Sequence, residues 1–344
     1  MTETSKSGFV YPPNTANLNL IPSFAESFTS HAKGLHFSSF NAYTSYIMIN
    51  QIKTFVQHKK SLLILHFTVF IWGFTGILGA LISTPAAQLV WYRVLIAYGT
   101  LLLWFLAKNK PIKVQWNALV KLFLTGAILG LHWILFFYSI KVSTVSVTLV
   151  SLSSITLFIS ILEPLTSRKS ISKLEIITGL TIIAGIALIF KFETKYSIGI
   201  ITGLASALCA SIFSIINSKL VKNISSTVIS FYELLGAWLW LSLYLLIQNH
   251  SDIANIPNSK DIVYLLILGI LCTAVAYVLG VSVMKELSAF RVALITNLEP
   301  LYGIALAYFF FGKSEQMSIG FYMGSALIIG AIFLFPYLKN KIKK

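Results

Sequence analysis

The chain has 344 residues, of which 56% are hydrophobic and only 11% are charged, and its mean hydropathy is +0.81. A soluble protein of this length could not bury so much apolar surface in one core, so the composition indicates a membrane protein. The formal net charge of +15 would fit a nucleic-acid-binding protein, but the placement of the basic residues argues against such a partner, as described below.

The first 47 residues are rich in Ser, Thr, Asn and Pro and contain no sustained apolar run. This composition predicts a disordered N-terminal extension over residues 1–47. The segment does not resemble a signal peptide, because no basic start precedes an apolar core and a small-residue cleavage site. Met48 is followed by INQIKTFVQHKK, a short basic lead into the first apolar run. We therefore expect Met48 to be the biological start and residues 1–47 to come from an over-extended gene start.

Apolar runs of roughly 18 residues recur along the rest of the chain, and each can cross ~30 Å of hydrocarbon as a helix. Ten are expected, at 62–82, 87–106, 118–140, 143–162, 174–190, 198–217, 227–247, 262–284, 289–311 and 318–337. The sequence therefore predicts an all-α membrane protein with ten transmembrane helices.

The basic residues concentrate on alternate connections between these spans. With the N-terminus in the cytoplasm, the outer segments hold only Lys141, Lys191, Lys195, Lys260 and Lys313, and the other basic connections lie inside. This asymmetry is typical of a multi-pass protein of the cell (inner or cytoplasmic) membrane. We expect the lipid bilayer as its surroundings, both termini in the cytoplasm, and no nucleic-acid partner.

The two halves of the sequence resemble each other. The Trp-Tyr-Arg motif that ends at Arg93 and the Phe-Tyr-Glu motif that ends at Glu233 lie 140 residues apart. Residues 141–170 lie over 285–314 at a constant offset of 144, with lysines matched at both ends. Five spans per half is an odd number, so the second half enters the membrane from the opposite side. Two inverted five-helix repeats are a recurrent architecture of secondary transporters.

Small residues predict close packing of several helices. Gly126 and Gly130, Gly199 and Gly203, and Gly320 and Gly324 each form a GxxxG pattern. This pattern lets helix backbones approach closely, although it is common by chance in apolar sequence.

Several segments resemble the EamA family of the drug/metabolite transporter superfamily. They are FIWGFTGILGA (70–80), WYRVLIA (91–97), SAFRVALITNLEPLYGIALAYFFFGK (288–313) and GSALIIGAIFLF (324–335). The resemblance implies EamA-like repeats over 60–190 and 197–338, followed by a basic cytoplasmic tail over 339–344. It also implies a carrier of small metabolites, commonly an exporter.

Glu299 lies near the middle of the ninth span, where a carboxylate costs on the order of 2.5 kcal/mol or more unless it has a partner, a proton or water. At about 1.5 Å per helical residue, Arg93, His132 and Glu299 fall within about 5 Å of one level near the midplane. An alternating-access carrier needs its polar groups at this level, so these three residues are candidates for binding the substrate or a coupling proton. Each residue also has a purely structural interpretation. Glu299 could pack between helices, Arg93 could extend its charged end toward the membrane surface, and His132 could be a hydrogen-bonded core residue.

Other spans contribute further candidates for binding the substrate or a coupling proton. Glu233 is equivalent to Arg93, but inversion places the two about 10 Å apart along the membrane normal, so we do not expect an ion pair. Asn297, Trp72 and Trp133 are candidates for lining a cavity, although aromatic residues in spans more often pack. Prolines leave backbone carbonyls without a donor, so helix bends are expected at Pro164 and Pro300.

The motifs exclude most other function classes. The sequence has no CxxC, HExxH, GxSG or Gly-rich phosphate loop, so we expect no metal, no cofactor and no enzymatic activity. A small metabolite, such as an amino acid or another zwitterion, is the expected partner, and the sequence does not predict an oligomeric state. A nucleotide-sugar or organic-anion carrier of the same superfamily is the alternative, and an intramembrane enzyme is a distant one.

Overall fold

The structure is a computed structural model that describes residues 37–167, 173–248 and 256–342. The chain divides into two compact units, Met1–Val56 and Gln57–Lys344. The sequence predicts an unstructured segment over 1–47, whereas helix α2 begins at Phe37. Residues 37–47 contain no Gly or Pro to stop a helix, and residues 1–36 lie outside the described part of the chain. All contacts described below lie within the second unit.

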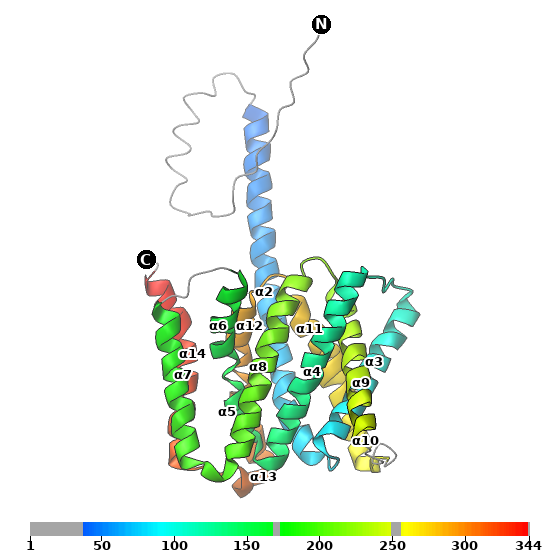
Figure 1. The fold of residues 1–344 in the computed structure, drawn as a ribbon. Helices are drawn as coiled ribbons and strands as arrows, with labels where there is room; N and C mark the ends of the chain where they lie inside the picture. The colour runs from blue at the N-terminus through cyan, green and yellow to red at the C-terminus, as the bar shows by residue number, and fades with distance from the viewer. Residues whose placement is uncertain (1–36, 168–172, 249–255, 343–344) are drawn as a thin grey trace. The chain divides into compact units, whose positions relative to one another are not determined.

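All the regular secondary structure in the described chain is helical (Figure 1). The first half contains α2 (Phe37–Leu81), α3 (Ala86–Lys108), α4 (Trp116–Val142), α5 (Val145–Leu152), α6 (Ile155–Ser167) and α7 (Lys173–Phe192). The second half contains η1 (Thr194–Tyr196), α8 (Ser197–Leu220), α9 (Ser226–Ile247), α10 (Ser259–Gly269), the π-helical η3 (Ile270–Val275), α11 (Ala276–Val283), α12 (Ala289–Thr296), α13 (Glu299–Phe311), η4 (Gly312–Glu315) and α14 (Ile319–Ile342).

Ten apolar segments account for the expected spans. Eight are long and apolar enough to cross a membrane, and two shorter ones, at Ile176–Phe192 and Ile319–Phe335, complete the set. The expected all-α fold with ten helical spans is therefore confirmed. Successive spans run in alternating directions, so the second set of five begins on the opposite face from the first (Figure 1). The predicted basic tail over 339–344 continues α14 as far as Ile342, and residues 343–344 lie outside the described residues.

The fourth and ninth spans are each broken into two helices at equivalent positions. Helices α5 and α6 occupy 145–152 and 155–167, and α12 and α13 occupy 289–296 and 299–311, so every boundary repeats at an offset of 144 residues. Pro300 lies in the first turn of α13, after the break, and its first-half equivalent is Thr156. Because the first break forms without an equivalent proline, the interruption belongs to the repeated backbone. Pro164 lies inside α6.

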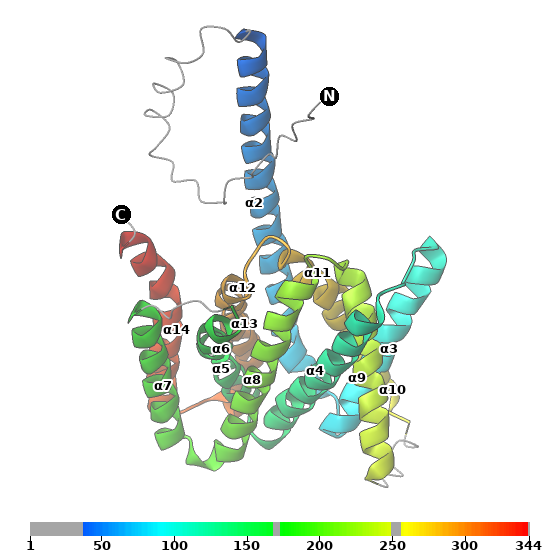
Figure 2. The ribbon, with the colours of Figure 1, turned by 45° about the horizontal axis from the view of Figure 1, so that its top comes forward.

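The two broken spans pack against each other, α5 with α13 and α6 with α12, between the remaining helices of both repeats. The last helices of the repeats, α7 and α14, also lie side by side (Figures 1 and 2). Glycines allow close approaches between α4 and α9 and between α7 and α14, as the GxxxG patterns predict. A Cβ atom added at Gly126 would lie 2.4 Å from the Glu233 carbonyl oxygen, and one at Gly324 would lie 2.6 Å from the Gly185 carbonyl oxygen.

Helix ends gather on two faces of the second unit. The face that we call the basic face contains Lys108, Lys222 and Lys285, where α3, α8 and α11 end. The opposite face contains the turns at Ser83 and Thr144, which precede α3 and α5.

Candidate substrate site

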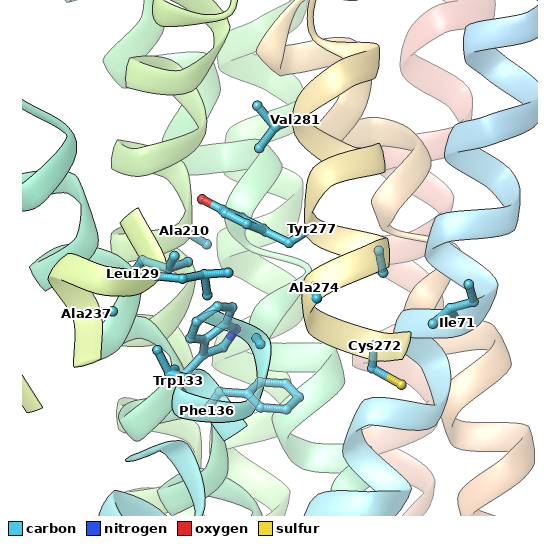
Figure 3. Packing of buried hydrophobic residues seen from close by; sticks show 14 of the residues in the cluster. Ile71, Leu129, Trp133, Phe136, Ala210, Ala237, Cys272, Ala274, Tyr277 and Val281 are labelled. Carbon is cyan, nitrogen blue, oxygen red and sulfur yellow. The ribbon is translucent and has the colours of Figure 1, made fainter. Parts of the chain in front are cut away.

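A cavity lies between the two repeats, and its empty volume is about 860 Å³ when the space that opens to the surroundings is included. The first repeat contributes Trp72, Thr75, Arg93, Leu129, His132, Trp133, Phe136, Leu152 and Ile155 to its wall. The second contributes Ala210, Phe213, Ser214, Asn217, Cys272, Tyr277, Gly280, Val281, Met284, Val292, Ala293, Thr296 and Glu299. Figure 3 shows part of this wall, with Tyr277 extending from α11 toward Leu129 and Trp133 of α4. The wall is therefore largely aromatic and apolar, with a few polar groups.

Arg93 brings a positive charge to this cavity from α3. Its side chain is only 2% exposed, and its Nε donates a hydrogen bond of 2.6 Å to Thr273 Oγ1. Its guanidinium carbon lies 4.3 Å from the ring centroid of Trp133, which is a cation–π distance. Its Nη1 has no hydrogen-bond partner among the described residues. The guanidinium is thus held on one side and keeps donors for a ligand.

Thr273, which accepts the hydrogen bond from Arg93, lies in an irregular helical segment. Thr273 belongs to the π-helical segment η3, and its hydroxyl donates to the carbonyl oxygen of Leu268 at 2.6 Å. The π-helical turn leaves this carbonyl within reach of the threonine side chain, and π-helical segments frequently occur at functional sites. The irregular turn thereby presents the threonine oxygen to the arginine.

Glu299 brings a negative charge to the same cavity. It is the first residue of α13, where the unsatisfied N–H groups of a helix start favour a carboxylate. Arg93 and Glu299 lie within electrostatic reach of each other, but no direct ion pair joins them in the described part of the chain. The cavity therefore presents a guanidinium group and a carboxyl group that do not contact each other directly.

His132 joins α4 to α8. Its Nδ1 lies 3.0 Å from the carbonyl oxygen of Ser206, and the Ser206 hydroxyl lies 2.8 Å from the same nitrogen. A carbonyl oxygen can only accept, so the geometry assigns the proton to Nδ1 and leaves Nε2 as the acceptor. The ring also contacts Phe213 edge-on at 5.4 Å. A neutral, well-packed histidine with one free acceptor fits this arrangement.

Two of the residues expected at the site do not line the cavity. Glu233 lies behind Tyr277, which donates a 2.6 Å hydrogen bond to its carboxylate. Asn297 donates to Thr156 Oγ1 at 2.5 Å and so ties the two broken spans together. Arg93, His132, Glu299, Trp72 and Trp133 do line it.

Sequence reasoning missed Tyr277, Asn217 and Thr273. Tyr277 could have been found from the duplication, because it lies eight residues before Lys285, as Trp133 lies eight residues before Lys141.

The cavity extends toward the basic face. The lining residues Asn217, Met284 and Val292 lie within about one turn of helix ends on that face. No residue of the turns on the opposite face is among those that line the cavity.

Three buried carboxylates close the opposite face. Glu315 of the second repeat accepts hydrogen bonds from the backbone nitrogens of Val145 and Ser146, both at 3.0 Å, and from the Ser146 hydroxyl at 2.6 Å. Asp261 of the second repeat accepts from the Ser83 nitrogen at 3.0 Å and the Ser83 hydroxyl at 2.5 Å. Glu193, after α7, accepts from the nitrogen of Ser318 at 2.8 Å, just before α14. The bonds of Glu315 and Asp261 join the second repeat to the first, and the bond of Glu193 joins the connection between the repeats to the second one.

Comparison with known proteins adds independent evidence. Residues 59–191 and 197–336 each match the EamA-like transporter family. An uncharacterized transporter from Archaeoglobus fulgidus is 22% identical over 287 residues, which cover 81% of this chain and 98% of that protein. A solved structure described only as "Crystal structure of protein" superposes with a TM-score of 0.62 at 16% identity, covering 81% of this chain and 98% of that one. At that identity the superposition supports the fold alone.

Proposed function

Because the chain belongs to the EamA-like transporter family, in agreement with the resemblance noted in the sequence, we propose that it is a secondary carrier of small metabolites that works by alternating access. The multi-pass membrane protein is thus a transporter and not an enzyme. The observation that carries the proposal is the cavity between the repeats, which extends toward the basic face and is closed by carboxylate bonds on the opposite face.

Alternating access requires the two faces to open in turn. In the described conformation the bonds of Glu315 and Asp261 hold the opposite face together. In the other conformation these bonds break, the halves rock about the broken spans, and the cavity opens to that side. The basic face is the cytoplasmic one in this proposal, because basic residues favour the cytoplasmic side. The carrier then works in the cell membrane with both termini in the cytoplasm.

The charges of the cavity favour a small zwitterion such as an amino acid. The free Nη1 donors of Arg93 suit a carboxylate, and Glu299 suits an ammonium group on the same molecule. The rings of Trp72, Trp133 and Phe213 suit an apolar body between these two ends. We propose export as the direction, since carriers that resemble this one are commonly exporters.

A carrier of nucleotide sugars or other multiply charged anions is the second candidate. Those ligands favour several basic groups in one cavity. Arg93 is the only lysine or arginine among the residues that line this cavity, and Glu299 would repel an anion. The single positive charge therefore favours a zwitterion over a polyanion.

Uptake into proteoliposomes tests this proposal, with the standard amino acids as radiolabelled probes. Arg93→Gln and Glu299→Gln should each reduce uptake at least about tenfold, because each leaves one end of a bound zwitterion without its partner. Arg291→Gln is the matched control, since Arg291 is exposed and bonds His58 outside the cavity. Wild-type uptake by both cavity variants would refute the assigned site.

A further inference from the structure

A second buried carboxylate lies outside the proposed substrate site. Glu233 on α9 is fully buried, at 0% exposure. Its Oε2 accepts hydrogen bonds from Tyr277 Oη at 2.6 Å and from Asn217 Nδ2 at 3.1 Å, and Asn217 Nδ2 also lies 3.0 Å from the Tyr277 hydroxyl. Its Oε1 has no partner among the described residues. Tyr277 and Asn217 line the cavity, so they form the layer between Glu233 and the cavity.

The groups around this carboxyl are neutral donors. Tyr277 from α11 touches it, whereas Arg93 from α3 and His132 from α4 line the cavity beyond Tyr277. Tyr98 from α3 packs against Phe231, which lies two residues earlier on α9. No cation pairs with Glu233 in the described part of the chain. A buried carboxylate costs a large free energy when no cation lies beside it. Binding a proton neutralises the group and removes that cost.

The inverted repeat gives this cluster a counterpart. Arg93 and Glu233 occupy equivalent positions in α3 and α9, and Trp133 and Tyr277 both lie eight residues before the matched lysines. Arg93 stacks on Trp133, and Glu233 bonds Tyr277. The two aromatic rings meet edge-on at 6.0 Å. The repeats therefore carry one charged residue each, of opposite sign, on either side of a central aromatic pair.

Arg93 and Glu233 differ in their access to the cavity. Arg93 lines it, and Glu233 is hidden behind Tyr277. In inverted-repeat carriers the two halves exchange roles as one face closes and the other opens. When the opposite face opens, Glu233 should therefore gain access to the cavity.

We propose that Glu233 carries the coupling proton of the transport cycle and that the Tyr277 hydroxyl passes this proton between Glu233 and the cavity. Water on the opposite face protonates the carboxylate when Glu233 faces the cavity. In the described conformation Oε2 gives the proton to Tyr277 Oη while Tyr277 passes its own proton to a cavity water, so the tyrosine stays neutral. The carboxylate that remains keeps the hydrogen bonds of Tyr277 and Asn217. The inference rests on the proposed alternating access, and it places proton binding away from Arg93 and Glu299.

The first experiment needs no substrate. Dicyclohexylcarbodiimide reacts with protonated carboxyl groups in apolar surroundings, and the full-length protein in liposomes can be treated at a series of pH values. Mass spectrometry should find the adduct on Glu233 and its yield should fall as the pH rises. The absence of an adduct on Glu233 at every pH would overturn the proposal, whether or not any amino acid is transported.

The second experiment compares two fluxes in proteoliposomes, with the amino acid that exchanges best as the probe. One flux is exchange at equal pH, and the other is accumulation driven by an imposed pH gradient. Glu233→Gln and Tyr277→Phe should lower the ratio of driven to exchange flux about tenfold, within the usual range of coupling between two sites. The matched controls, Glu286→Gln and Tyr98→Phe, should keep the wild-type ratio, because neither residue touches the Glu233 carboxyl.

Tyr277→Phe retains the ring that packs on Trp133 and Phe213, so it keeps the test valid if Glu233→Gln does not fold. An unchanged ratio in Tyr277→Phe would overturn the proposal, and so would a parallel loss of both fluxes, which is the signature of a structural role. If no amino acid exchanges in wild-type protein, the proposed substrate class fails, and the carbodiimide result still decides the proton site.

Discussion

Glu315→Gln should release the closed face of the carrier. The carboxylate accepts three hydrogen bonds at the start of α5, two from backbone N–H groups at 3.0 Å and one from the Ser146 hydroxyl at 2.6 Å. A hydrogen bond to a charged group contributes about 1.5–3 kcal/mol. Glutamine has one acceptor oxygen, and its amide nitrogen would point at a backbone donor, so we expect a loss of about 3 kcal/mol. That loss shifts the equilibrium between the two conformations about a hundredfold toward the one open on the opposite face.

The assay places a reporter cysteine in the cavity. Thr296 lines it and is partly exposed, so Thr296→Cys in a background with Cys209→Ser and Cys272→Ser gives one reactive thiol. A membrane-impermeant maleimide is then added from one side of the membrane at a time. Without the Glu315 change the reporter should react faster from the basic face, and with Glu315→Gln it should react faster from the opposite face.

Glu286→Gln is the matched control, because Glu286 is exposed on the basic face and its backbone nitrogen bonds Val283 of the same repeat. Labelling from the basic face alone, at the same rate with and without Glu315→Gln, would refute the role of these carboxylate bonds in closing the opposite face.

Two further predictions concern the packing of the repeats. Gly126→Ala should lower the melting temperature of the purified protein, because the added Cβ meets the Glu233 carbonyl oxygen and overpacking costs about 1–3 kcal/mol; Gly99→Ala, with open space at its Cβ, should not. Asn297→Leu should destabilise the protein by about 1–2 kcal/mol through the lost bond to Thr156 Oγ1, and most of that effect should vanish in a Thr156→Val background. Equal effects of Gly126→Ala and Gly99→Ala, or additive effects of the Asn297 and Thr156 changes, would contradict these accounts.

The sequence was sufficient to predict that three of the candidate residues lie close together. Helical rise is nearly constant, so counting residues from the predicted span ends placed Arg93, His132 and Glu299 near one depth, and all three line the cavity. The same arithmetic placed Arg93 and Glu233 apart, and no ion pair joins them in the described chain.

The broken spans could not be predicted from hydropathy. Residues 145–166 form an uninterrupted apolar run, and no proline or glycine marks the break at Ser153 and Ser154. Several hydroxyl side chains surround that break, and they can bond nearby backbone groups, as Ser153 Oγ does with the Leu149 carbonyl at 3.3 Å. The prolines predicted bends at Pro300 and at Pro164, whereas the fourth span breaks at Ser153 and Ser154, and Pro164 lies inside α6.

The carboxylates of the opposite face are a second feature that the sequence alone could not predict. Glu193, Asp261 and Glu315 lie in or beside short connections, where the sequence alone favours solvated residues. Their partners come from the other half of the chain, and the Glu315 bond to Val145 joins residues 170 positions apart. Only the packing of the two halves brings such groups together, so no local pattern could identify them.

Counter-flow in proteoliposomes tests the central claim most directly, namely that this chain is a carrier with one alternately exposed site. Wild-type protein is reconstituted with an unlabelled amino acid inside, and the uptake of the same labelled amino acid is followed from outside. The account predicts saturable uptake that the internal amino acid accelerates, and loss of that acceleration in Arg93→Gln but not in Arg291→Gln. Uptake that rises linearly with concentration and ignores the internal amino acid would contradict it.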